Sequence, residues 1–184
     1  MLMKPDISSL LLIDLQVKLA PAIAGIERIV TNAGALMRAA DRLGIPLSIT
    51  EHCADRIGPT VPELRTMAPD EAIIGKSYFS GVVEGPLGDR LAALGRPKVI
   101  VGGTETHVCV LQTTLDLKAA GYAPCLVADA TGTRHDIDRD VAVARMRDAG
   151  VTIVTTEMVL FEWLERGDSE DFAALLPLIK ATNR

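Results

Sequence analysis

The residue that most directly suggests chemistry is Cys109, which follows the apolar run Val99–Val101, two glycines and a few small polar residues. Apolar residues then return at helical spacing from Val108 to Ala119, and Gly121 marks a helix end. The pattern predicts that Cys109 lies in the first turn of a helix, just beyond a strand, where open α/β sheets bind ligands. Free backbone N–H groups there lower a thiol pKa, so Cys109 is a candidate nucleophile. The alternative is a buried, inert cysteine.

Two charged residues end other apolar runs, and they complement a thiol. Asp14 closes the run that begins at Ser9, and Lys76 closes the run that begins at Ala72. Taken singly, Asp14 is equally typical of a turn cap and Lys76 of a solvated side chain. In a parallel sheet, however, all carboxyl ends of the strands share one edge, so both residues should meet Cys109 there. A carboxylate can take the thiol proton and an ammonium can hold the thiolate, which together make an activated nucleophile.

Alternating apolar runs and helical patterns predict the elements that position these residues. We expect strands over 9–14, 45–50, 72–76, 98–101, 124–129 and 151–155. We expect helices over 26–43, 87–94, 138–149, 157–164 and 170–180, besides the helix that carries Cys109. Residues 51–70 and 77–85 read as loops. Strands that alternate with helices predict an α/β fold, a parallel sheet with helices on both faces, in one domain over residues 1–184.

Composition excludes several classes of function. The net charge of −5 and the aromatic share of 3% argue against nucleic acid and anionic membranes as partners. Three cysteines without a C-x-x-C pattern argue against a disulfide framework. The apolar run before Asp14 is too short for a signal peptide or a membrane span, so we expect a cytoplasmic protein.

Three blocks of the chain resemble the signature blocks of the isochorismatase-like cysteine hydrolases, a superfamily that includes nicotinamidase, N-carbamoylsarcosine amidase and isochorismatase. The blocks are Leu11–Gln16, Gly75–Ser80 and Gly102–Val110, and they occur in the family's order. Shorter stretches resemble the branch called isochorismatase domain-containing hydrolases; these are Gly58–Leu64, Thr113–Leu117 and Val127–Ala130.

The resemblance implies a Rossmann-like three-layer sandwich with six parallel strands in the order 3-2-1-4-5-6. It also implies Asp14 as base, Lys76 as partner of the thiolate and Cys109 as nucleophile. A cis peptide bond is implied at Thr104–Glu105, and it would aim the Glu105 N–H beside the Cys109 N–H as an oxyanion hole. The implied reaction is hydrolysis of a small amide or related acyl compound through a thioester, in a homo-oligomer.

The chain departs from nicotinamidases at the strand end where they bind a metal. Glu51 and Cys53 stand at positions that would be ligands there, so we expect no metal, although His52 and Cys53 could in principle bind zinc. We also expect no cofactor. No G-x-G-x-x-G follows the first strand, and the Gly75–Lys76 pair lacks the upstream glycine of a phosphate-binding loop.

The substrate pocket is harder to predict than the nucleophile. Gln16, Leu19, Glu51, Tyr78 and Glu105 are candidates for lining it. Two alternatives to amide hydrolysis remain. One is isochorismate-type vinyl ether hydrolysis, whose family members lack the thiol. The other is a catalytically silent scaffold, which we expect to have lost one of the three catalytic residues.

Overall fold

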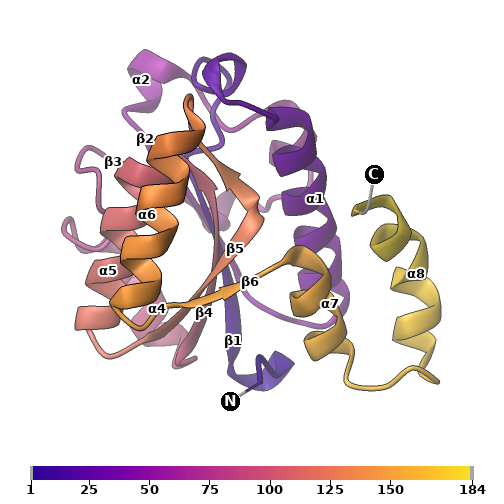
Figure 1. The fold of residues 1–184 in the computed structure, drawn as a ribbon. Coiled ribbons are helices and arrows are strands. Elements are labelled where there is room, and N and C mark those ends of the chain that lie inside the picture. Colours follow the sequence, from indigo (N-terminus) through magenta and orange to yellow (C-terminus); the bar gives the residue numbers. More distant parts are fainter. Residues whose placement is uncertain (1, 183–184) are drawn as a thin grey trace.

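The computed structural model describes residues 2–182, and its centre is a six-stranded parallel sheet (Figure 1). The strand order is β3-β2-β1-β4-β5-β6, which confirms the predicted order 3-2-1-4-5-6. The strands are β1 (Ser8–Ile13), β2 (Leu47–His52), β3 (Ile73–Lys76), β4 (Lys98–Thr104), β5 (Ala123–Gly132) and β6 (Thr152–Val154).

Helices cover both faces of the sheet, as Figure 1 shows with one group on each side. One group is α1 (Ile26–Arg42), α7 (Thr156–Leu164) and α8 (Glu170–Thr182). The other is α4 (Pro86–Leu94), α5 (Leu111–Ala119) and α6 (Asp136–Asp148). The segment predicted as the loop 51–70 carries short helices, α2 (Ala54–Ile57), α3 (Pro62–Arg65) and the beginning of a 3-10 turn, η3 (Asp70–Ala72). Two further 3-10 turns are η1 (Pro5–Ile7) and η2 (Ala20–Ala22).

The central strand β1 explains why its sequence is continuously apolar. Leu10 and Leu12 pack into the core beneath α1, whereas Leu11 and Ile13 pack into the core beneath α4 and α5. All four side chains are fully buried, because successive residues of a strand point to opposite faces and both faces are covered. Within residues 2–182, no helix is long and apolar enough to cross a membrane.

β4 runs three residues beyond the end that its apolar pattern predicts. Gly102 and Gly103 stay paired with β1, opposite Leu12 and Ile13. At Gly103 the backbone has φ +124°, and an added Cβ would lie 2.1 Å from the Ile13 carbonyl oxygen. Only glycine permits this approach, which brings the ends of β1 and β4 together.

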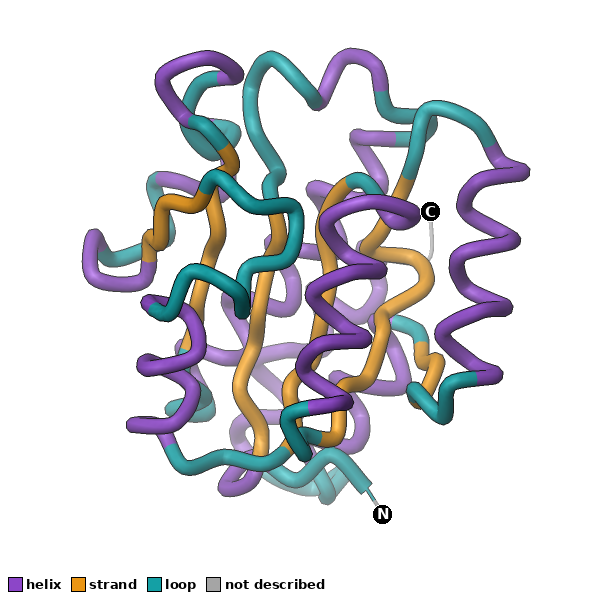
Figure 2. The backbone as a smooth tube through the Cα atoms, turned by 90° about the vertical axis from the view of Figure 1, so that its left-hand side faces the viewer, coloured by secondary structure: helices purple, strands orange, loops and turns teal. Residues whose placement is uncertain are grey.

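The turn after β4 also differs from the predicted single helix. Thr106–Val110 forms a π-helical turn, η4, and α5 begins only at Leu111. Cys109 therefore lies in a widened turn ahead of the α-helix, still at the carboxyl edge of the sheet. Figure 2 looks onto a face of this sheet, with its strands side by side behind helices of one layer.

Candidate active site

Asp14 stands at the end of β1, where the chain turns. Its backbone has φ +50°, a left-handed conformation that Asp tolerates better than most residues. The carboxylate Oδ1 accepts a hydrogen bond of 2.7 Å from the Thr50 hydroxyl on β2. The Asp14 carbonyl accepts another, also of 2.7 Å, from the Thr104 hydroxyl on β4. Both neighbouring strands therefore fix this fully buried residue.

Lys76 reaches Asp14 from two strands away. Its Nζ lies 2.6 Å from Asp14 Oδ2, and both side chains are only 1% exposed. Strands are spaced at about 4.8 Å, so the lysine side chain must cross β2 to make this contact. Nζ also donates to the carbonyl oxygens of Tyr78 and Phe79, at 3.2 Å each. The ion pair is thus fully hydrogen-bonded in a site shielded from water.

Cys109 joins this pair, because the charges of both Asp14 and Lys76 shift the pKa of its thiol. The thiol is buried, and burial is the main reason why its pKa rises to about 12. The negative charge of Asp14 raises the pKa further, while Lys76 opposes the shift. The prediction of a lowered pKa at this helix start is therefore wrong. Desolvation and the carboxylate outweigh the ammonium and the favourable end of the helix.

Glu105 follows the Thr104–Glu105 peptide bond, which is cis. Its carbonyl accepts hydrogen bonds from the N–H groups of Val108 (3.0 Å) and Val110 (3.3 Å), the latter across the π-helical turn. Its side chain is largely buried, and Oε2 accepts bonds from the Nε (3.0 Å) and backbone N–H (3.3 Å) of Arg134. The oxyanion hole formed by the N–H groups of Glu105 and Cys109 stays a prediction.

Gln16 and Glu51, both predicted to line the substrate pocket, carry structural hydrogen bonds. Gln16 Nε2 donates to the carbonyls of His52 (3.1 Å) and Gly58 (2.5 Å), and Oε1 accepts from the His52 N–H. Glu51 Oε1 accepts from the N–H and hydroxyl of Thr60. These bonds tie the segment after β2 to the end of β1. A role toward substrate stays a prediction for both.

Leu19 and Tyr78 are the remaining residues predicted to line the pocket. Leu19 is half-buried against the core beneath α1, whereas Cys109 belongs to the core on the other face of the sheet. Tyr78 follows Lys76 and is 58% exposed. Contact of either side chain with a substrate stays a prediction.

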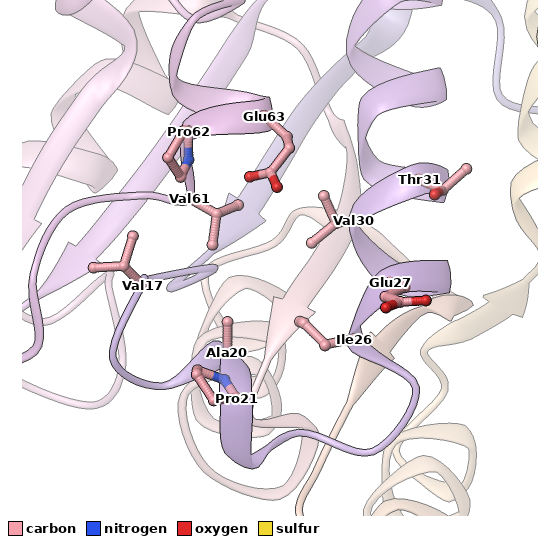
Figure 3. Close-up of a pocket in the computed structure, with 10 residues that line it drawn as sticks. All are labelled: Val17, Ala20, Pro21, Ile26, Glu27, Val30, Thr31, Val61, Pro62 and Glu63. Carbon is pink, nitrogen blue, oxygen red and sulfur yellow. The ribbon is translucent and has the colours of Figure 1, made fainter.

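Two cavities lie near this end of the sheet. One of about 490 Å³ sits between η2, α1 and α3; Figure 3 shows its apolar side chains, which include Val30 and Val61, with Glu27 and Glu63 beside them. None of the three predicted catalytic residues lines it. A second cavity, of about 520 Å³, is lined by both Glu51 and Lys76 at the carboxyl ends of β2 and β3.

Metal-binding residues do not gather in the part of the chain that the structure describes. No group of three His, Cys, Asp or Glu side chains there is arranged to hold an ion. Glu51 is bonded to Thr60 instead, and Cys53 is one of three free cysteines.

Sequence reasoning missed three residues that organise the site. Thr50 and Thr104 bind Asp14, and Arg134 binds Glu105. The two threonines carried a signal, since each hydroxyl stands at or near the end of a strand next to β1. Arg134 carried none, because its position in the turn before α6 says nothing about where its long side chain goes.

Comparison with known proteins gives one consistent result. A family model described as the isochorismatase domain matches residues 8–158. The chain is 35% identical to isochorismatase domain-containing protein 2A of Mus musculus, over 96% of this chain and 84% of that protein. It is 30% identical to isochorismatase family protein 1B of Dictyostelium discoideum, over 96% and 87% of the two chains.

Solved structures share the whole fold. The MAR1 ribonuclease from Caenorhabditis elegans superposes with a TM-score of 0.92 at 35% identity, covering 98% of this chain and 93% of that one. YcaC from Pseudomonas aeruginosa, solved with hexane-2,5-diol and covalent acrylamide, gives 0.92 at 28% identity, over 99% and 94%. The YcaC gene product of Escherichia coli, described as an octameric hydrolase of unknown specificity, gives 0.91 at 25% identity, over 98% and 90%.

Proposed function

The chain belongs to the isochorismatase domain family, and we propose that it is a cysteine hydrolase that cleaves a small amide or related acyl compound. In this proposal Cys109 is the nucleophile, Asp14 the base and Lys76 the cation that balances their charge. The observation that carries it is the buried contact of 2.6 Å between Lys76 and Asp14, whose charges both act on the buried Cys109 thiol.

The first half of the reaction forms a thioester. Asp14 takes the proton of the Cys109 thiol as the sulfur attacks the substrate carbonyl, and a carbon–sulfur bond forms. The N–H groups of Glu105 and Cys109 stabilise the negative oxygen of the tetrahedral intermediate. The carbon–nitrogen bond then breaks, and the amine leaves with the proton that Asp14 returns.

The second half releases the acid. Asp14 takes a proton from a water molecule as the oxygen of that water attacks the thioester carbonyl. The carbon–sulfur bond breaks, the carboxylic acid leaves, and the proton returns to the Cys109 sulfur. Neither half, as proposed, uses a metal or a cofactor.

The raised thiol pKa is compatible with this chemistry, because the proton does not have to reach solvent. With Asp14 charged, the thiol holds its proton. When that proton moves to Asp14, the repulsion between carboxylate and thiolate disappears and Lys76 pairs with the sulfur. The site keeps zero net charge in both states, so no uncompensated charge is buried.

One experiment tests the assignment of the nucleophile. A panel of small amides is screened by release of ammonia with the wild type, Cys109→Ala and the control variant Cys53→Ser. We expect the wild type and the control to turn over and Cys109→Ala to lose at least about a thousandfold in kcat with its fold intact. A Cys109→Ala enzyme that keeps the wild-type rate would refute the mechanism.

A relative supports the choice of a reactive nucleophile. The YcaC structure from Pseudomonas aeruginosa holds covalent acrylamide. We therefore expect acrylamide to add once to this chain, at Cys109, and the adduct to be absent from Cys109→Ala by intact mass. Absence of catalysis and of labelling together would favour the scaffold alternative.

Ribonuclease activity, which the name of the Caenorhabditis elegans neighbour suggests, does not suit this chain. The net charge of −5 on this chain opposes binding to a phosphate backbone. We further propose that the chain is a single-domain homo-oligomer that acts on a small molecule in the cytoplasm. The octameric relative from Escherichia coli supports the assembly.

A further inference from the structure

We infer that Arg134 is a positioning residue for the oxyanion hole: it holds the Glu105 side chain and thereby orients the Glu105 N–H. The inference rests on the proposed function, since it requires that this N–H meets the oxygen of a tetrahedral intermediate. It adds a residue outside the three signature blocks to the machinery of the site.

The contacts of Arg134 are directed at one oxygen atom. Both its Nε and its backbone N–H donate to Glu105 Oε2, at 3.0 and 3.3 Å. The Glu105 side chain is 11% exposed and the Arg134 side chain 54% exposed. An arginine that donates from side chain and main chain to the same carboxylate fixes its direction better than a single ion pair does.

The backbone on both sides of Glu105 is held separately by β5 and β1. The Thr131 hydroxyl donates to the Gly103 carbonyl at 2.8 Å and lies 2.9 Å from the Thr106 hydroxyl. The Thr104 hydroxyl binds Asp14. Among the described residues, only Arg134 hydrogen-bonds the side chain of Glu105 itself. The N–H groups of Val108 and Val110 hold the Glu105 carbonyl, and Arg134 adds the restraint on the Glu105 side chain.

Arg134 also corrects an electrostatic problem. A carboxylate on the residue that supplies an oxyanion donor opposes the negative charge that develops there. A guanidinium is always charged and pairs with that carboxylate, so it offsets the opposition. Losing Arg134 should weaken stabilisation of the transition state, because the Glu105 N–H is less well oriented and the Glu105 charge is no longer offset. The stability of the fold should change little, because the Arg134 side chain is half exposed.

The test compares two reactions of Cys109, of which only one forms an oxyanion. Acylation by p-nitrophenyl acetate passes through a tetrahedral oxyanion: the carbon–sulfur bond forms, the ester carbon–oxygen bond breaks and p-nitrophenolate leaves. Alkylation by iodoacetamide displaces iodide at a saturated carbon and forms no oxyanion. Both rates are measured for the wild type, Arg134→Ala, Arg134→Lys and Arg139→Ala. The last is a control that removes an arginine paired with Asp136 and Asp140 on the surface of α6.

We expect Arg134→Ala to slow acylation about tenfold or more, a fraction of the ~100-fold cost of losing an oxyanion donor outright. Its alkylation rate should stay within about twofold, Arg134→Lys should lie between, and Arg139→Ala should match the wild type. An acylation rate in Arg134→Ala equal to that of the wild type overturns the inference. An equal loss of the acylation and alkylation rates overturns it as well.

A double-mutant cycle with Glu105→Gln tests whether Arg134 acts through Glu105. The effect of Arg134→Ala on acylation should shrink at least about threefold in the Glu105→Gln background, because the two residues are coupled. An unchanged effect overturns the inference. The proposed function fails in a different way, through a Cys109→Ala enzyme that is still acylated or a wild type that never is.

Discussion

At the scale of single residues, the proposed chemistry depends on where one proton resides. Cys109, Asp14 and Lys76 share one buried site, and the raised pKa of the thiol places the proton on sulfur at rest. The negative charge then sits on Asp14, between the Lys76 ammonium and the Thr50 hydroxyl. Asp14 is thus held as an acceptor at the place where the sulfur must lose its proton.

The raised thiol pKa predicts a pH-dependent stability. The unfolded state releases the Cys109 proton near pH 9 and the folded state only near pH 12. The contribution of the protonated Cys109 thiol to folded-state stability is therefore complete below pH 9 and is lost as the pH rises toward 12. Between pH 8 and 10, the wild type should lose about 1.4 kcal/mol of unfolding free energy relative to Cys109→Ala. Urea denaturation of both proteins at each pH measures this, and parallel pH profiles would contradict it.

The ion pair predicts a strong effect of removing its cation. Lys76→Met leaves the Asp14 carboxylate buried without its charged partner, which should cost about 3–5 kcal/mol of unfolding free energy. The double variant Asp14→Asn/Lys76→Met should recover part of that loss, since it buries no charge. Urea denaturation at pH 7 compares the two. A single variant as stable as the wild type would mean that Asp14 is not charged.

The three catalytic candidates could be proposed from the sequence because Asp14 and Lys76 each end an apolar run at the carboxyl edge of a parallel sheet, and Cys109 follows a third run there. The thiol pKa was not, since its direction depends on how deeply Cys109 is buried and on how near Asp14 lies. Gln16 illustrates another limit. Its position after β1 suggests a pocket, yet its amide is used to bind the backbone of His52 and Gly58.

At the scale of elements, the close approach of β1 and β4 sets the geometry of the site. Gly103 has no room for a Cβ, since it would lie 2.1 Å from the Ile13 oxygen and 2.5 Å from the Ile13 nitrogen. Ile13 precedes Asp14 and Gly103 precedes Thr104, so the contact fixes both ends at once.

This approach predicts that Gly103→Ala is severely destabilising. The two strands must separate, and the cost should exceed about 4 kcal/mol of unfolding free energy. Gly75→Ala on β3 is the matched control, because nothing lies within 4 Å of its Cβ position, and it should stay within about 0.5 kcal/mol. Thermal and urea unfolding of both variants measure the difference. Similar stability of the two would contradict the account of the β1–β4 contact.

Element types followed from periodicity, but several boundaries did not. β4 continues through Gly102 and Gly103, where the apolar pattern stops, because pairing with β1 compensates for poor strand formers. The π-helical turn at Thr106–Val110 has the same apolar spacing as an α-helix start. The short helices α2 and α3 lie in a segment rich in Gly and Pro, which reads as a loop.

At the scale of the whole molecule, the surface carries apolar side chains that a monomer would leave in water. Tyr78, Phe79 and Val83 follow β3 and are at least half exposed, as are Ile137 and Val141 on α6. We predict that sedimentation equilibrium or light scattering gives a mass that is a multiple of 19.6 kDa. A mass of one chain at micromolar concentration would contradict the proposed assembly.

The sheet order has a consequence for how the chain would acquire the proposed activity. Asp14 lies on the central strand, Lys76 arrives from two strands away on one side, and Cys109 follows the neighbour on the other. A nascent or partly folded chain contains all three residues, but they are not yet close enough for their charges to interact. Its sulfur is an ordinary thiol until long-range pairing is finished, so misfolded copies should not turn over substrate. Turnover, rather than thiol labelling, therefore reports correctly completed molecules.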